Sequence, residues 1–110
     1  RLIKEAYQIP KEEKERRRDA IQSAGMKAAD VPLANGALCL RVHELGKRLS
    51  GRSNPNAASD IAVGLELSRI GYHGCLANVR ANLGLIKDEH IRNGYEQRIA
   101  SLELERSAAC

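Results

Sequence analysis

The chain has 110 residues, of which 43% are hydrophobic and 29% charged, and its formal net charge is +4. This length allows one domain with a modest core, and the composition is typical of a soluble globular protein. The sequence has three Tyr, no Phe and no Trp, so aliphatic residues must fill the core, which favours packed helices over a β-sandwich. Because acidic residues alternate with Lys and Arg and no aromatic platforms accompany them, we expect no nucleic-acid partner.

The first third of the chain predicts two helical stretches. Residues 1–8 have a helical pattern that ends before Pro10. The run KEEKERRRD that follows places Glu and Arg three and four residues apart, as on an exposed helix face. From Ile21 onward, small residues indicate close contact with another helix: Ala24, Gly25, Ala28 and Ala29.

We expect Pro32 to kink or break the helix that contains it, because proline lacks the backbone N–H and its ring crowds the preceding turn. A second apolar series follows at helical spacing and ends near Gly51. We interpret it as a stripe that faces the core: Leu38, Val42, Leu45 and Leu49.

The segment NPNAASD, residues 54–60, predicts the start of a helix. Asn54 is suited to the capping position and Pro55 to the first helical position, while Ser59 and Asp60 supply acceptors for the first turn. Asn56 lies in the same turn. Two interpretations of Asp60 remain open at this point, namely part of a helix start or a chemically active carboxylate.

The longest helical pattern follows this segment. One face is apolar: Ile61, Leu65, Ser68, Tyr72, Leu76, Val79, Leu83 and Ile86. A second face is small and polar: Asp60, Gly64, Leu67, Gly71, Gly74, Asn78 and Asn82. Each glycine costs helix propensity of roughly 1 kcal/mol relative to Ala, so this face needs a close helix or a ligand to cover it. We therefore expect a homodimer with helix-on-helix contacts.

A last amphipathic helix is expected after Asp88, which is a plausible N-cap, with an apolar face of Ile91, Tyr95, Ile99 and Leu102. No strand alternation is present, so the fold class is all-α, a multihelical bundle with long helices. No apolar run is long enough to span a bilayer and no signal peptide is present, so we expect no membrane association and a cytoplasmic location.

The cysteines and histidines do not suggest a metal site. Cys39, Cys75 and Cys110 are widely spaced with no CxxC pair, and the first two are expected to be buried small hydrophobes. His43, His73 and His90 have no metal-ligand partner four residues further along the chain. We expect the histidines to be structural or exposed, with no metal bound.

Three segments together resemble one family: VPL (31–33), NPNAASD (54–60) and NVRANLGLIKDE (78–89). They are similar to the cyclodeaminase domain of formimidoyltransferase-cyclodeaminase and to bacterial relatives described as methenyltetrahydrofolate cyclohydrolases, from about Tyr7 to Leu102. The resemblance implies an all-helical fold, an intertwined homodimer, and action on a tetrahydrofolate derivative as substrate. The family's N-terminal half, with its TPGGGS-like stretch, has no counterpart here. We therefore expect residues 1–110 to be a single helical domain, the C-terminal part of a longer one.

The resemblance also implies roles for particular residues. Ring closure on the folate needs a base, and Asp60 is the candidate because a helix N-terminus favours its charged form. Asn78 and Asn82 suit the pterin amide edge, or alternatively bridge helices. Asn54 and Asn56 are candidate ligand contacts, or alternatively they only cap the helix. Arg80 and Lys87 are also candidate ligand contacts, or alternatively ordinary surface charges.

Two functions from different classes follow from these observations. The first is a folate-dependent one-carbon enzyme, a formimidoyltetrahydrofolate cyclodeaminase or a methenyltetrahydrofolate cyclohydrolase. The second is a non-catalytic helical dimerisation or ligand-binding module that keeps the family fold.

Overall fold

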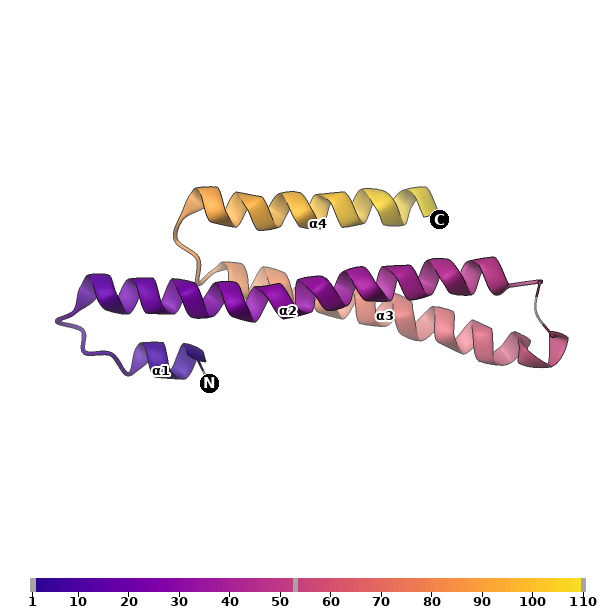
Figure 1. Ribbon diagram of the computed structural model, residues 1–110, viewed down its shortest axis with the longest axis horizontal. Helices are drawn as coiled ribbons and strands as arrows, with labels where there is room; N and C mark the ends of the chain where they lie inside the picture. Colours follow the sequence, from indigo (N-terminus) through magenta and orange to yellow (C-terminus); the bar gives the residue numbers. More distant parts are fainter. Residues whose placement is uncertain (1, 53, 110) are drawn as a thin grey trace.

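The structure, a computed structural model, describes residues 2–52 and 54–109. These residues form α1 (Leu2–Tyr7), α2 (Lys14–Leu49), a short 3-10 helix η1 (Pro55–Ala57), α3 (Ala58–Leu83) and α4 (Glu89–Ala109), with no strand among them. The predicted all-α class is confirmed. Figure 1 shows α2 and α3 as a long antiparallel hairpin, with α1 folded back beside the first half of α2 and α4 running along the opposite side. The turn after α2 contains Gly51, whose φ of 78° is the left-handed conformation that glycine tolerates best.

The prediction that Pro32 breaks the helix is wrong, because α2 continues through it from Lys14 to Leu49. A proline inside a helix leaves the carbonyl four residues earlier without its usual N–H partner, and here that carbonyl belongs to Ala28. The side-chain Nδ2 of Asn82 on α3 donates to this Ala28 oxygen at 3.5 Å. A neighbouring helix therefore supplies the missing donor, and α2 remains continuous.

The core lies where α2, α3 and α4 meet. The predicted apolar face of α3 is confirmed from Ser68 onward, and Ile86, which follows the helix, is also buried. The face predicted for the last helix is confirmed as well, since Tyr95 and Ile99 are buried and Ile91 and Leu102 pack against them. The buried core residues are Ala29, Leu33, Leu40, Tyr72, Leu76, Val79, Leu83, Ile86, Tyr95 and Ile99.

The stripe of Leu38, Val42, Leu45 and Leu49 does not face this core, and that prediction is wrong. All four side chains are more than half exposed. The opposite side of α2, with Ala29, Leu33 and Leu40, is the buried one. α2 carries apolar residues on two sides, and periodicity alone does not say which side meets the rest of its own chain.

The molecule is flat and elongated, measuring 64 × 25 × 13 Å. Its radius of gyration is 18.2 Å, whereas a compact domain of this length has about 13 Å. Its accessible surface is 7597 Å², against about 6,000 Å² expected for a compact monomer of this mass. Much apolar surface is therefore left uncovered by the chain itself.

The glycines show where the helices approach most closely. A Cβ atom built at Gly71 would lie 3.0 Å from Cys39 Sγ on α2, so this position is a close contact, as predicted. A Cβ atom built at Gly64 or at Gly74 would meet nothing within 4 Å. The chain itself therefore does not cover that part of the predicted small face. The two cysteines Cys39 and Cys75 meet at this crossing, and burial raises the pKa of the Cys75 thiol.

We expect Gly25→Ala to destabilise the fold by about 1–2 kcal/mol, because an added methyl would lie 2.8 Å from Leu85 Cβ in a packed region. Gly94→Ala is the matched control on α4, where a Cβ meets nothing within 4 Å. Its expected effect is a gain of up to about 1 kcal/mol from helix propensity. Chemical denaturation of both variants measures the difference, and equal stability changes would contradict the close packing at Gly25.

Candidate functional site

The start of α3 combines the capping role and the candidate carboxylate. Asn54 Oδ1 accepts a hydrogen bond from the backbone N–H of Asn56 at 3.0 Å, so Asn54 caps the 3-10 helix. Asp60 lies in the first turn of α3 with an exposed side chain and makes none of the capping hydrogen bonds. Capping is therefore assigned to Asn54, and the Asp60 carboxylate is available for a chemical role.

Asn78 and Asn82 form a hydrogen-bonded pair one turn apart near the end of α3. Asn82 Nδ2 lies 3.0 Å from Asn78 Oδ1 and 2.9 Å from the Asn78 carbonyl oxygen. The same nitrogen reaches the Ala28 carbonyl on α2. Asn82 thus bridges two helices, while the side chain of Asn78 is exposed beside it.

The predicted site residues do not come together within one chain. Asp60 and Asn78 both lie on α3, and a helical rise of 1.5 Å per residue separates them by about 27 Å. Arg80 is exposed and contributes to lowering the pKa of Glu103 on α4. Lys87 lies beyond the helix, where its Nζ donates to the Gly84 carbonyl at 3.3 Å.

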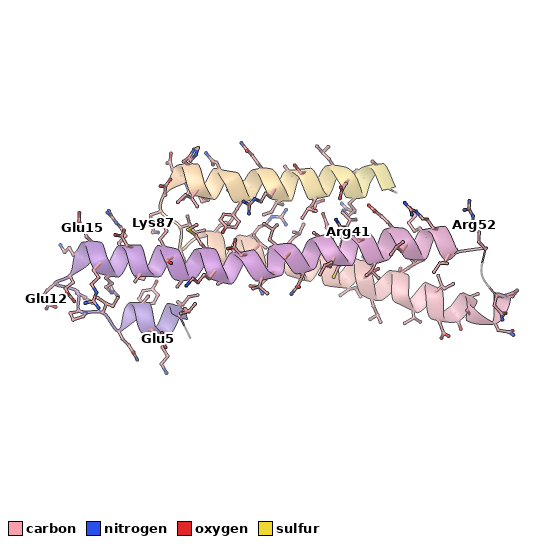
Figure 2. The ribbon with its side chains drawn as sticks, viewed as in Figure 1. Glu5, Glu12, Glu15, Arg41, Arg52 and Lys87 are labelled. Carbon is pink, nitrogen blue, oxygen red and sulfur yellow. The ribbon has the colours of Figure 1, made fainter. Side chains whose placement is uncertain are left out.

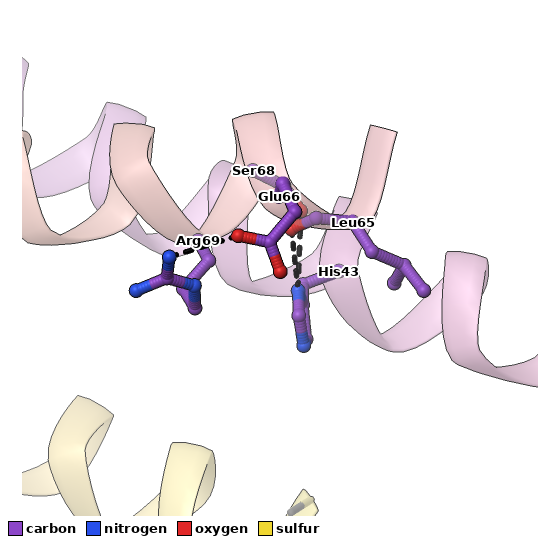
Figure 3. Close-up of polar contacts among 5 residues, drawn as sticks. All are labelled: His43, Leu65, Glu66, Ser68 and Arg69. Carbon is purple, nitrogen blue, oxygen red and sulfur yellow. Dashed lines mark hydrogen bonds and ion pairs between the residues drawn. The ribbon is translucent and has the colours of Figure 1, made fainter. Parts of the chain in front are cut away.

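A polar cluster that the sequence did not indicate joins the last turns of α2 to the first half of α3. His43 Nδ1 lies 3.2 Å from the Leu65 carbonyl oxygen and 3.2 Å from Ser68 Oγ, and Ser68 Oγ donates to the same carbonyl at 2.9 Å (Figure 3). A hydrogen bond of 2.8 Å from Arg69 lowers the pKa of Glu66 beside it. Residues 25 apart in sequence carry no local signal of such contacts.

The polar cluster continues toward α4. Tyr72 Oη donates to Glu103 Oε1 at 3.2 Å, and Arg106 pairs with the other carboxylate oxygen at 3.1 Å. Burial, reinforced by the Glu103 charge, raises the pKa of Tyr72 to about 12. The hollow between these groups holds only about 40 Å³, too little for a folate ring system. The hydrogen bonds and the ion pair around it form a network that holds α2, α3 and α4 together.

A groove of about 860 Å³ lies between α2 and α4. Tyr95 Oη donates to Asp30 Oδ1 and lies 3.3 Å from the Met26 carbonyl oxygen, and burial raises the pKa of Tyr95 to about 12. This volume suits a small-molecule site. None of the candidate catalytic or ligand-binding residues named from the sequence lines the groove. Asp30 is therefore a second carboxylate to weigh against Asp60.

The two shifted tyrosines predict a loss of stability at high pH. Each holds its proton more tightly in the folded state, where its pKa is about 12 instead of 10. Their contribution is thus fully present below pH 10 and is lost as the pH rises from 10 to 12. Melting curves across this window are expected to shift to lower temperature, and Tyr95→Phe to shrink the shift. A melting temperature that stays constant in this range would contradict the two buried hydrogen bonds.

No helix in the part of the chain that the structure describes is long and apolar enough to cross a membrane. No group of three or more His, Cys, Asp and Glu side chains within it is placed to hold a metal ion.

Comparison with known proteins places the chain in a family. The family model described as formiminotransferase-cyclodeaminase matches residues 2–101. A methenyltetrahydrofolate cyclohydrolase from Methylorubrum extorquens is 35% identical over 101 residues, covering 89% of this chain and 47% of the relative. The chain thus spans about half the length of that curated relative, and no solved structure gives a significant match. The chain belongs to the formiminotransferase-cyclodeaminase family.

Proposed function

We propose that this chain is part of an enzyme that acts on the one-carbon unit between N5 and N10 of tetrahydrofolate. The reaction is either formimidoyltetrahydrofolate cyclodeamination or methenyltetrahydrofolate cyclohydrolysis. The observation that carries the proposal is the family match over residues 2–101, together with the likeness to a relative named as a methenyltetrahydrofolate cyclohydrolase. The substrate is a folate derivative.

The chemistry assigns Asp60 a role in either reaction. In cyclodeamination N10 attacks the formimino carbon on N5 and ammonia leaves, so a base must take the N10 proton. In cyclohydrolysis water adds to the cationic methenyl carbon, and a base must take a proton from that water. Asp60 is an exposed carboxylate in the first turn of α3. It serves as the base and as a counter-charge to the cationic carbon.

We propose that the site is completed across a homodimer. The outer side of α3 exposes an apolar stripe of Val63, Leu67 and Ile70, each more than half exposed, and a Cβ at Gly74 meets nothing within 4 Å. The surface left uncovered exceeds that of a compact monomer by roughly 1,500 Å², whereas a standard interface covers about 800 Å² on each partner. A second copy supplies the missing cover.

The position of the stripe along α3 explains how two copies unite the site. If two α3 helices pack antiparallel about a two-fold axis near Ile70, residue 60 of one copy lies opposite residue 80 of the other. Asp60 of one subunit then lies beside Asn78 of the second, which is hydrogen-bonded to Asn82. The 27 Å separation within one chain becomes a short distance between chains. Asn56, at the same end of the helix, completes the candidate ligand contacts, and Asn54 keeps its capping role.

The second candidate is a non-catalytic helical dimerisation or ligand-binding module. It is favoured by one observation, the donation of Asn82 Nδ2 to α2, which occupies part of the proposed ligand-binding pair. Thermal-shift measurements with 5-formimino- and 5,10-methenyl-tetrahydrofolate, beside turnover assays of the full-length gene product, separate the two. Stabilisation with turnover supports the enzyme, stabilisation without turnover the ligand-binding module, and no stabilisation by either folate contradicts both folate proposals.

A further inference from the structure

A basic hollow of about 320 Å³ lies where α1, the first turns of α2 and the α3–α4 loop meet. Five cationic side chains line it, and no acidic residue of the described chain does. The lining residues are Tyr7, Lys11, Lys14, Arg17, Arg18, Ile21, Gly84, Leu85 and Lys87. Such a concentration of like charge in one hollow is unfavourable unless an anion compensates for it.

Arg17 is the best-defined cation in this hollow. Its guanidinium lies 5.2 Å from the centre of the Tyr7 ring, so the side chain is held in place by a cation–π contact. Its Nε atom is buried and has no hydrogen-bond partner. A buried donor without a partner costs free energy, and a guanidinium binds carboxylate and phosphate oxygens through two parallel hydrogen bonds. Arg17 lines the hollow, so its guanidinium is placed to bind an anion there.

The acidic residues close to the hollow are engaged elsewhere. Glu13 pairs with Arg16 at 2.9 Å, and Asp88 Oδ1 accepts hydrogen bonds from the backbone of His90 and Ile91 at the start of α4. Gln22 Oε1 accepts hydrogen bonds from the backbone N–H groups of Lys87 and Asp88 at 3.0 and 2.8 Å. These bonds fix the loop that carries Lys87. Figure 2 shows Glu12 at the tip of the loop between α1 and α2 and Lys87 beside the first turns of α2. Within residues 2–52 and 54–109, none of the five cations that line the hollow forms an ion pair with a carboxylate.

We propose that this basic hollow is a binding site for a small multivalent anion that carries carboxylate or phosphate groups. Its volume accommodates an anion of the size of citrate or pyrophosphate. Arg17 makes the oriented hydrogen bonds, and the lysines act as mobile point charges around it. The site is independent of the folate site proposed above, because none of the residues assigned there lines it.

Isothermal titration calorimetry of the full-length protein with citrate and, separately, with pyrophosphate at constant ionic strength tests the site. At least one of the two is expected to bind, and the stronger one identifies a carboxylate or a phosphate ligand. Raising the salt concentration is expected to weaken the binding. Arg17→Gln should weaken it about tenfold, the scale of one charge-assisted hydrogen bond, and Lys11→Gln, at a fully exposed position, by a smaller factor without risk to the fold.

Arg48→Gln is the matched control, since it removes the same charge from an exposed position in the last turn of α2, at the other end of the molecule. It is expected to leave the affinity within about twofold, because exposed charges beyond a Debye length are screened. Absence of heat for both anions at millimolar concentration overturns the proposal. An equal loss in Arg48→Gln and in Lys11→Gln overturns it as well, because binding then depends on net charge and not on this hollow.

Discussion

Replacing Asp60 by Asn is expected to lower the turnover of 5-formimino- or 5,10-methenyl-tetrahydrofolate on the order of a hundredfold or more, the scale of losing a general base. The substitution keeps the shape and hydrogen-bonding capacity of the side chain and removes its charge. Asp60 is exposed and makes no capping hydrogen bond. The melting temperature is therefore expected to change little. Steady-state rates beside a melting curve of the same preparation provide the measurement.

Two control substitutions make this result specific. Asn54→Ala removes the cap of the same helical start and should cost roughly 1 kcal/mol of stability while leaving substrate affinity nearly unchanged. Asp30→Asn changes the other carboxylate, the partner of Tyr95 in the groove between α2 and α4. If Asp30→Asn abolishes turnover and Asp60→Asn does not, the reaction takes place in that groove and the assignment of Asp60 is wrong.

Replacing Ile70 by Glu is expected to convert the proposed homodimer into monomers. Ile70 is 58% exposed in the isolated chain, so the new carboxylate remains hydrated in a monomer. In the proposed antiparallel pair it is buried against its own copy near the two-fold axis, where two unpaired like charges are strongly unfavourable. Sedimentation velocity at micromolar concentration measures the change, and folate turnover should fall with the dimer fraction.

Leu104→Glu on α4 is the matched control, because Leu104 is also an exposed apolar residue, at 73%, but lies off the α3 stripe. It should leave the dimer intact. A folded wild-type monomer at micromolar concentration, or an Ile70→Glu variant that stays dimeric, would contradict packing through α3.

The start and the buried face of α3 could be predicted from the sequence, because the signals that mark them are local. The apolar face from Ser68 to Leu83 and the start signal at Asn54 depend on spacing and on capping chemistry within a few residues. The continuity of α2 was not predictable, because the partner of the carbonyl freed by Pro32 is Asn82, fifty residues further along the chain. The rule for proline in helices includes the hydrogen bond that the Ala28 carbonyl loses within α2. It cannot include the bond that this carbonyl gains from Asn82.

The side of α2 that faces the core was predicted wrongly for a related reason. Leu38 and Leu40 are close in sequence, yet one is exposed and the other buried, because α2 has apolar residues on two sides. The contact of His43 with Ser68 similarly depends on the register of two helices. Asp60 and Asn78 share a helix at helical spacing, so the pattern placed them on one face without bringing them close together. The proposed homodimer brings them together across two chains.

Mixing two inactive variants tests the shared site most directly. Asp60→Asn and Asn78→Ala each remove one side of the proposed site, and both residues are exposed in the single chain, so neither change should unfold it. When the two full-length variants are co-expressed, half of the dimers are mixed, and each mixed dimer has one site with both native residues. Turnover is expected to recover to about a quarter of the wild-type value under random two-fold assembly. Activity no higher than that of either parent variant would contradict a site built from Asp60 of one subunit and Asn78 of the other.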